Sequence, residues 1–161
     1  MSSRPQPAHG ESWAHSGPCP CGSGLTAQAC CVRLHERLER TGELTAPTAE
    51  ALMRSRFTAF ARLAIEPTAT RAMVDYLRAT WDPDGRPSVA DLTPSQDDPA
   101  AEFTRLAILD VRDGGPFHTA GEVEFVALGR HADGSRLRLH ERSRFRREHG
   151  VWRYLDGHAP A

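Results

Sequence analysis

The chain has 161 residues, of which 39% are hydrophobic and 25% charged, and its formal net charge is −1. This length and composition predict a soluble protein with one domain of ordinary size and a short appendage. Because the net charge is close to zero, the overall electrostatic field does not steer the protein toward nucleic acid or membranes. All 20 basic residues are Arg, a bias that we attribute to the coding sequence rather than to function.

The N-terminal segment, residues 1–16, is polar and rich in Ser, Pro and His. We expect it to be a disordered leader, or at most a loose strap over the segment that follows. It lacks the apolar region of a secretory signal, and no part of the chain approaches the roughly 20 apolar residues of a membrane span. The sequence therefore predicts a cytosolic protein with no membrane partner.

All cysteines of the chain lie in one short segment, as a Cys-x-Cys pair and a later Cys-Cys pair. Clustered thiols in the reducing cytosol favour a metal site over a disulfide, with a redox dithiol or inert thiols as alternatives. Four thiolates suit a tetrahedral Zn²⁺ ion, and iron is the second choice. The predicted metal ligands are Cys19, Cys21, Cys30 and Cys31. His15 and His35 are weaker candidates, either as replacement ligands or as hydrogen-bond donors to the thiolates.

Three segments that follow the cysteines have apolar residues at the spacing of a helix. Thr41-Gly42 is expected to end the first helix, Glu50 to lie in the first turn of the second, and Thr70 to cap the third. The predicted helices run from about residue 32 to 40, from 47 to the break at Pro67, and from 70 to 81.

The second half of the chain reads as strands, after a Pro-rich and Asp-rich loop over residues 82–99. Strands are expected at 103–111, 121–130, 136–147 and 151–156. The first is apolar on both faces and is therefore expected to be central. Helices followed by antiparallel strands predict an α+β fold, with the helices packed on one face of a curved four-stranded sheet.

The cysteine segment, with Pro20 and Gly22-Ser23-Gly24 between the thiols, resembles the SEC-C motif. This resemblance implies a zinc knuckle whose ligands are the four cysteines. It also implies docking to a protein partner, and ribosome or RNA contact as a weaker possibility. The division that we expect is a leader over 1–16, a knuckle with its helix over 17–42, and a larger domain over 43–157.

The larger domain resembles the YchJ-like family in five segments, which are residues 48–60, 76–81, 121–127, 139–145 and 152–157. The resemblance implies a nuclear-transport-factor-two-like, cystatin-like cone, in which helices cover a curved sheet. The biochemical role of that family is uncharacterised. Asp82 stands where the family usually has His, so a role for that His is not expected here.

The third predicted strand has two chemically different faces, because side chains alternate along a strand. One face carries an Arg-rich stripe, which is Arg136, Arg138, His140, Arg142, Arg144 and Arg146. The stripe could bind RNA phosphates. We favour a solvated outer face, because Glu122 and Glu124 on the preceding strand would lie opposite these residues and no aromatic side chains interleave with them.

The other face of this strand carries Glu141 and Ser143 among apolar residues. A carboxylate that faces a core needs a partner. We favour a structural ion pair with Arg54 or Arg56. The alternative is a base in a cone pocket, as in isomerases or dehydratases of this fold class. Further pocket candidates are Trp81, Tyr154 and Asp156. Because the sequence contains no recognisable triad or phosphate loop, a non-enzymatic, zinc-binding adaptor is the leading hypothesis.

Overall fold

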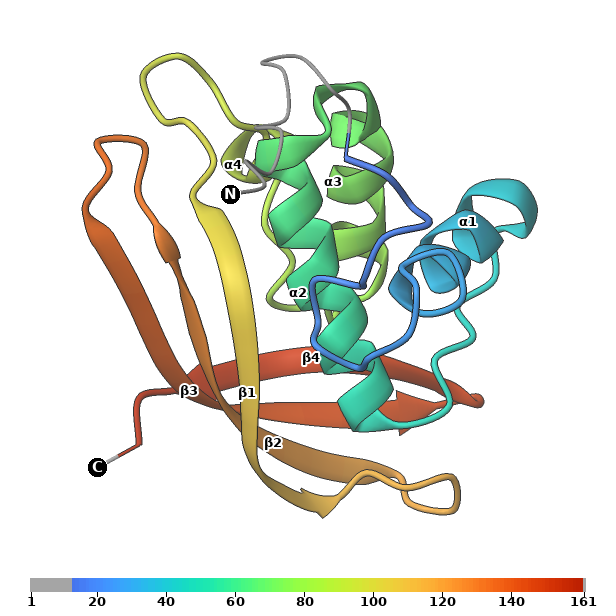
Figure 1. Cartoon of the computed structure of the whole chain (residues 1–161). Helices are drawn as coiled ribbons and strands as arrows, with labels where there is room; N and C mark the ends of the chain where they lie inside the picture. Colours follow the sequence, from blue (N-terminus) through green and yellow to red (C-terminus); the bar gives the residue numbers. More distant parts are fainter. Residues whose placement is uncertain (1–12, 161) are drawn as a thin grey trace, which may run out of the picture.

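The computed structural model describes residues 13–160 and shows helices gathered on the concave side of a curved antiparallel sheet (Figure 1). The helices are α1 (Cys31–Thr41), α2 (Ala49–Ile65), the 3-10 helix η1 (Pro67–Ala69), α3 (Thr70–Ala79) and the short α4 (Val89–Leu92). The strands are β1 (Glu102–Asp113), β2 (Ala120–Arg130), β3 (Arg136–Glu148) and β4 (Val151–His158). The predicted α+β fold is confirmed. Between residues 13 and 160, no helix combines the length and the apolar character needed to cross a membrane.

Helix α2 is the central element of the helical layer. The hydroxyl of Thr48 accepts a hydrogen bond from the Ala51 amide at 3.0 Å and so caps its first turn. Leu52, Met53 and Phe57 are buried in the core that α2 shares with the sheet. Polar residues on the other sides of α2 are buried as well, because α1 and α3 cover them. One face of α2 therefore meets the sheet while the rest meets other helices.

The helix termini agree with the sequence in two cases and differ in one. Gly42 ends α1 with a φ of +75°, a left-handed conformation that favours glycine. Glu50 lies in the first turn of α2. The side chain of Thr70 does not cap α3. Its hydroxyl donates to the carbonyl of Pro67, because η1 leads directly into the helix. The predicted loop over 82–99 contains only the single turn of α4.

The sheet is a meander in the order β1-β2-β3-β4, so β1 lies at an edge. The prediction of a central first strand is wrong. Two irregularities in the pairing with β2, near Phe103 and near Ile108, interrupt the alternation of β1, so that Phe103, Leu106, Ile108 and Val111 all pair with β2 residues of the concave face. Leu109, the extra residue of the second irregularity, is 53% exposed. The apolar residues at both odd and even positions of the β1 sequence are thus explained by bulges and not by burial of the strand on both faces.

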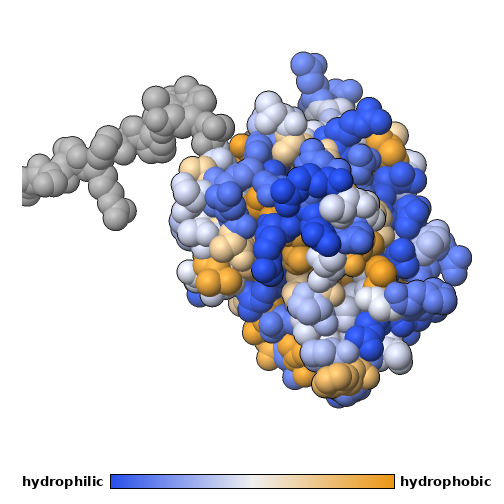
Figure 2. All heavy atoms as spheres, turned by 90° about the vertical axis from the view of Figure 1, so that its right-hand side faces the viewer, coloured by the Kyte–Doolittle hydropathy of each residue, from blue (hydrophilic) through white to orange (hydrophobic). Residues whose placement is uncertain are grey.

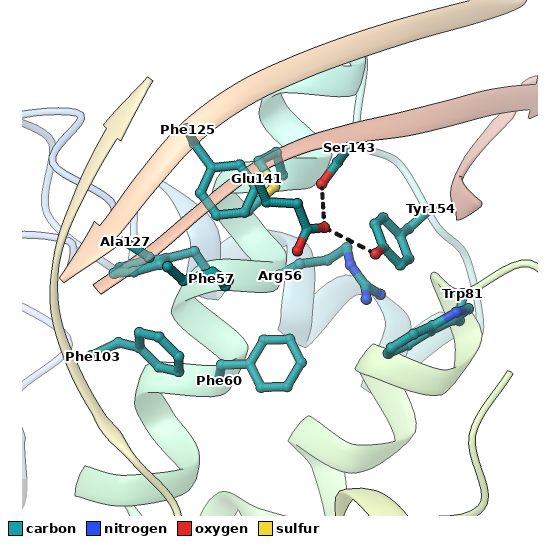
Figure 3. Close-up of a pocket in the computed structure, with 12 residues that line it drawn as sticks. Arg56, Phe57, Phe60, Trp81, Phe103, Phe125, Ala127, Glu141, Ser143 and Tyr154 are labelled. Carbon is teal, nitrogen blue, oxygen red and sulfur yellow. Dashed lines mark hydrogen bonds between the residues drawn. The ribbon is translucent and has the colours of Figure 1, made fainter. Parts of the chain in front are cut away.

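A third irregularity lies in β4 and decides which side chains reach the concave face. Phe145 pairs with Tyr154, and Arg144 pairs with Asp156, so Leu155 is an extra residue in β4. A bulge of one residue reverses the alternation of the strand. Tyr154 therefore points to the concave side, as the close-up of that side shows (Figure 3), while Asp156 pairs with Arg144 outside.

A buried hydrogen-bond network joins α1 to α2. His35 donates from Nε2 to the carbonyl of Ser55 at 2.8 Å, and its Nδ1 accepts from the Arg62 guanidinium at 2.8 Å. Arg62 also donates to the Glu66 carboxylate at 2.8 Å. Both ring nitrogens of His35 are therefore engaged, which leaves neither for a metal.

Residues 13–16 of the predicted leader make specific contacts with α2, while residues 1–12 lie outside the described residues. The Trp13 ring lies 5.7 Å from the Arg62 guanidinium, and His15 Nε2 lies 3.1 Å from the Glu66 carboxylate. His15 is thus held at the C-terminal end of α2. The two histidines considered as alternative metal ligands both serve this network instead.

The burial of His35 makes stability depend on pH. Burial lowers the pKa of His35 to about 3, whereas an unfolded His titrates near its ordinary pKa of 6.5. The folded state therefore binds fewer protons between these values, so its stability is complete above pH 6.5 and falls as the pH drops toward 3. The expected slope is about 1.4 kcal/mol per pH unit. Urea unfolding of the wild type and of His35→Gln between pH 5 and 6.5 should show a smaller slope in the variant.

The matched control for this measurement is His131→Gln, which makes the same change at an exposed position. Arg62, Glu66 and His15 face His35 in both proteins, and the Glu66 carboxyl titrates below this window because Arg62 and His15 lower its pKa against the effect of burial. Equal slopes in the wild type and in His35→Gln would contradict the assignment.

Candidate metal centre and ligand pocket

The four cysteines form a compact cluster at the start of α1. Their sulfur atoms all lie within 4.8 Å of one another, with 3.6 Å between Cys21 and Cys30 and 3.9 Å between Cys30 and Cys31. A tetrahedron with Zn–S bonds of about 2.3 Å has edges of about 3.8 Å. All four cysteines are free thiols. The cluster therefore has the donor atoms and the dimensions of a tetrahedral metal site.

The loop between the two cysteine pairs is shaped by glycine. Gly22 and Gly24 have φ values of +78° and +86°, which side chains other than hydrogen rarely allow. The amide of Cys19 donates to the carbonyl of Leu25 at 2.9 Å, which closes the loop on itself. The Ser23 hydroxyl lies 3.1 Å from the Cys30 sulfur and can donate to a thiolate there.

The cysteine thiols affect one another's ionisation. Hydrogen bonding with Cys19 and Cys31 lowers the pKa of Cys21 far below its usual range. Hydrogen bonds to Cys19 and Cys21, followed by burial, raise the pKa of Cys31. Because the pKa values of Cys21 and Cys31 shift in opposite directions, these two thiols do not ionise together without a compensating charge. A bound metal dication would supply the positive charge that allows all four thiols to ionise.

The knuckle is packed into the core of the larger domain. The sulfur of Cys19 lies 3.7 Å from the Thr58 hydroxyl of α2. Arg54, also of α2, donates a hydrogen bond to the Cys21 carbonyl at 2.7 Å. Cys19, Cys21 and Cys31 belong to the same buried cluster as Phe57. The knuckle and α2 therefore depend on each other for their burial.

A cavity of about 300 Å³ opens on the concave face between α2 and the sheet (Figure 3). Half of the twelve residues that line it are aromatic, namely Phe57, Phe60, Trp81, Phe103, Phe125 and Tyr154. Arg56, Glu141 and Ser143 form a polar corner. The predicted pocket residues Trp81, Glu141, Ser143 and Tyr154 thus all line one cavity. Asp156, also predicted, does not line it, because the bulge at Leu155 places it outside with Arg144.

Glu141 is held by two hydroxyl groups. Its Oε1 accepts from Ser143 at 2.9 Å and from Tyr154 at 3.1 Å. Burial, followed by the Glu141 charge, raises the pKa of Tyr154, which keeps its hydroxyl protonated as a donor. Gly157 leaves room for the carboxylate, since a Cβ at that position would lie 1.8 Å from Oε1. Among residues 13–160 no ion pair to Glu141 is formed, so the predicted pair with Arg54 or Arg56 is absent.

Arg56 supplies the positive charge of the corner. Its Nη1 donates to the Leu77 carbonyl at 3.0 Å and to the Thr80 hydroxyl at 2.7 Å. The guanidinium carbon lies 4.7 Å from the Trp81 ring centre and 4.6 Å from that of Tyr154. Burial lowers the pKa of Arg56 to about 10, which leaves it cationic at neutral pH. The sequence suggested Arg56 only as a partner for Glu141 and gave no sign of these aromatic contacts.

The Arg-rich stripe lies on the convex face, as predicted, and carboxylates oppose it. Glu122 pairs with Arg144 and Glu124 with Arg142 in the sheet register. Arg142 also forms an ion pair with Asp110 of β1. The opposing carboxylates explain this stripe as part of a solvated, charge-balanced face. Asp82, at the position of the family's His, pairs with Arg146 at 2.7 Å and is buried.

The shared core predicts that loss of the metal ligands destabilises the whole chain. Cys21→Ser should lose most of the bound metal and lower the free energy of unfolding by more than about 4 kcal/mol, the range in which loss of a metal site falls. Elemental analysis and urea unfolding followed by tryptophan fluorescence measure the two effects. Ser23→Ala, which keeps all four sulfur atoms, is the control. Metal loss with unchanged unfolding would contradict the coupling.

Comparisons with known proteins match both the cysteine segment and the larger domain. Residues 48–157 match the family described as YchJ, middle NTF2-like domain, and residues 18–32 match the SEC-C motif. The chain is 46% identical over 140 residues to a UPF0225 protein of Streptomyces coelicolor, covering 87% of this chain and 94% of that protein. It is 48% identical to a UPF0225 protein of Corynebacterium efficiens, covering 86% and 91%.

Two solved structures share the fold. The solution structure of a SEC-C motif containing protein from Rhodopseudomonas palustris has a TM-score of 0.65 and 35% identity, covering 89% of this chain and 98% of that one. The crystal structure of a SEC-C motif containing protein from Psychrobacter arcticus has a TM-score of 0.66, covering 89% and 82%. At 22% identity the second shows the fold alone. With its cysteine cluster and its cone, the chain belongs to the YchJ-like family of NTF2-like proteins that carry a SEC-C motif.

Proposed function

We propose that this chain is a zinc-stabilised protein that binds a small, largely apolar molecule in the cone cavity without transforming it. The observation that carries the proposal is the cavity, whose aromatic wall surrounds one small polar corner. Ligand sites generally combine an apolar lining with a few placed polar groups, and volumes of about 300 to 1,000 Å³ are typical. The cavity lies at the lower end of that range, which suits a ligand of about two rings.

The metal has a structural part in this proposal. Zinc is the metal that we propose, with iron as the alternative, and four thiolates would complete a tetrahedral shell without an open position for substrate. The cysteines would hold zinc, and zinc would fix the loop over residues 19–31 against α2. Free thiols in a closely packed cluster accord with the cytosolic location expected from the sequence.

Docking of the knuckle to a protein partner stays a prediction. Leu25 at the outside of the loop is 54% exposed and is the residue best placed for such a contact. The face of the molecule that carries α1 is mainly hydrophilic, with apolar residues in small groups between polar ones (Figure 2). A partner there would need polar contacts as well as Leu25. RNA or ribosome contact through the Arg-rich stripe has less support, because Glu122, Glu124 and Asp110 oppose its charge.

The cavity can be tested by filling it. Ala127 is buried and lines the cavity, so Ala127→Phe should occupy the space that a ligand needs. We expect 1-fluoronaphthalene to bind the wild type, seen as broadening of its fluorine NMR signal, and to bind Ala127→Phe at least about tenfold more weakly. Ala132→Phe, in the exposed β2–β3 turn, is the control. The cavity proposal fails if the wild type and Ala127→Phe broaden the signal equally, or if neither does.

A second candidate is an isomerase or dehydratase in which Glu141 is the base. It is favoured by the absence of an ion pair to Glu141 and by the proximity of Arg56, which could stabilise an enolate oxygen. Glu141 would take a proton from the carbon beside a ketone, and a solvent deuteron would return. Proton NMR of 2-indanone in D₂O should then show exchange that is at least about tenfold slower with Glu141→Gln. Equal exchange in the two proteins would exclude this chemistry for that ketone and favour the non-enzymatic role.

A further inference from the structure

The polar corner of the cavity contains one cation and one anion that do not neutralise each other. Arg56 and Glu141 both line the cavity, and the Glu141 charge acts on Arg56, yet no ion pair between them is formed. Their side chains converge on the same space from α2 and from β3 (Figure 3). Oppositely charged groups so close usually pair directly unless each is held elsewhere. The groups that hold them therefore determine what the corner offers to a ligand.

Arg56 is fixed through only one of its nitrogens. Both of its hydrogen bonds, to Leu77 and to Thr80, are donated by Nη1. Nε and Nη2 make no hydrogen bond within residues 13–160, and neither is among the buried polar atoms sealed from solvent there. The Trp81 and Tyr154 rings fix the plane of the guanidinium. Arg56 thus presents N–H donors to the cavity in a fixed orientation.

Glu141 is fixed through only one of its oxygens. Oε1 accepts from both Ser143 and Tyr154, while Oε2 has no hydrogen bond within residues 13–160. The second oxygen points away from the two hydroxyls, toward the cavity (Figure 3). Glu141 therefore presents an acceptor to the same cavity to which Arg56 presents donors. A ligand that satisfies both charged groups must carry an acceptor and a donor.

The charges of Arg56 and Glu141 exclude two common kinds of ligand head, by which we mean the polar group of a ligand that would lie in this corner. A carboxylate would pair with Arg56 but would place a second negative charge beside Glu141, which is unfavourable at short range. An ammonium group would pair with Glu141 but would be repelled by Arg56 in the same way. A neutral head with an acceptor and a donor meets neither repulsion. A purely apolar head would leave Nε and Nη2 of Arg56 and Oε2 of Glu141 without hydrogen bonds, which is costly in a site that excludes water.

The walls restrict the body of the ligand. Phe57, Phe103, Phe125 and Phe60 surround the space next to the corner, and the rings of Phe57 and Phe103 lie 5.8 Å apart in an edge-to-face arrangement. Aromatic walls favour flat rings, which they contact by stacking or by their edges. A cavity of about 300 Å³ accommodates two fused rings more readily than a long chain.

From these contacts we infer that the ligand is a neutral, planar heterocycle with a lactam edge, in which a ring carbonyl lies next to a ring N–H. The carbonyl accepts from Arg56, the N–H donates to Glu141 Oε2, and the fused rings lie among the phenylalanines. This inference deepens the proposed function and rests on it. It adds that the corner selects for the paired acceptor and donor, and not merely for apolar surface.

Four probes of similar size separate these features. Quinolin-2(1H)-one has the carbonyl and the N–H, 1-methylquinolin-2-one lacks the N–H, 2-naphthoate carries a negative charge, and naphthalene lacks both polar groups. Competition against 1-fluoronaphthalene in fluorine NMR ranks them on the full-length, zinc-loaded protein. We expect quinolin-2(1H)-one to bind about tenfold or more tightly than each of the other three, since hydrogen bonds to charged groups carry discrimination of that size.

Three variants assign the selectivity to the corner. Glu141→Gln removes the anion at nearly constant size, so the advantage of quinolin-2(1H)-one over its methylated form should shrink by about tenfold, and 2-naphthoate should bind more tightly. Gly157→Ala should have the same effect on the advantage, because its Cβ displaces the Glu141 carboxylate. Glu148→Gln makes the same chemical change on β3 at an exposed position and should leave the ranking unchanged.

The outcomes distinguish the inference from the proposal on which it rests. If naphthalene and 1-methylquinolin-2-one bind as tightly as quinolin-2(1H)-one, the lactam inference is wrong while the cavity still binds apolar molecules. If 2-naphthoate binds most tightly to the wild type, the ligand is an anion held by Arg56 and the inference is equally wrong. If neither 1-fluoronaphthalene nor any probe binds, the proposed ligand-binding function itself is overturned.

Discussion

The packing of α2 against the concave face of the sheet is the contact on which both sites depend. Toward its N-terminal half the helix supports the cysteine knuckle, through Arg54 and the Cys21 carbonyl and through Thr58 and Cys19. The same stretch supplies Arg56 and Phe57 to the cavity. Because its other sides are covered by α1 and α3, α2 has little freedom to tilt or rotate. A change at either site is therefore transmitted to the position of the helix that builds the other.

In this arrangement a bound metal would have a role that a metal in a separate appendage could not have. The loop over residues 19–31 has little apolar content of its own, and too small a core to fold alone. Its cysteines are nevertheless buried in the main core, where free thiols behave as small apolar side chains. Charging four buried thiols without a cation would be unfavourable. Zinc would make that charged state compatible with burial, so that the knuckle could rigidify α2 and, through it, the cavity wall.

The sequence predicted the element types and the site residues better than it predicted their exact surroundings. The four clustered cysteines, the change from helical to strand periodicity and the opposite faces of β3 were all local patterns, and the structure reproduces them. The position of β1 at the edge and the outward orientation of Asp156 were not predicted, because a bulge of one residue shifts the alternation and the sequence does not show where bulges occur. The lack of an ion pair between Glu141 and Arg54 was not predictable either. Arg54 donates instead to the Cys21 carbonyl, whose position in space the sequence does not show.

The retention of a buried guanidinium without a carboxylate partner is the feature that most needs a functional explanation. Arg56 is 4% exposed, and a carbonyl, a hydroxyl and two ring faces replace only part of its hydration. A methionine would fill the same space at lower desolvation cost, so packing alone does not require a cation here. The Glu141 carboxylate lies nearby but is held by Ser143 and Tyr154 in a position where it cannot complete the pair. An arrangement that keeps two opposite charges apart inside an aromatic wall stabilises the free protein poorly. It becomes favourable when a third group bridges them, which is what a ligand with a paired acceptor and donor would do.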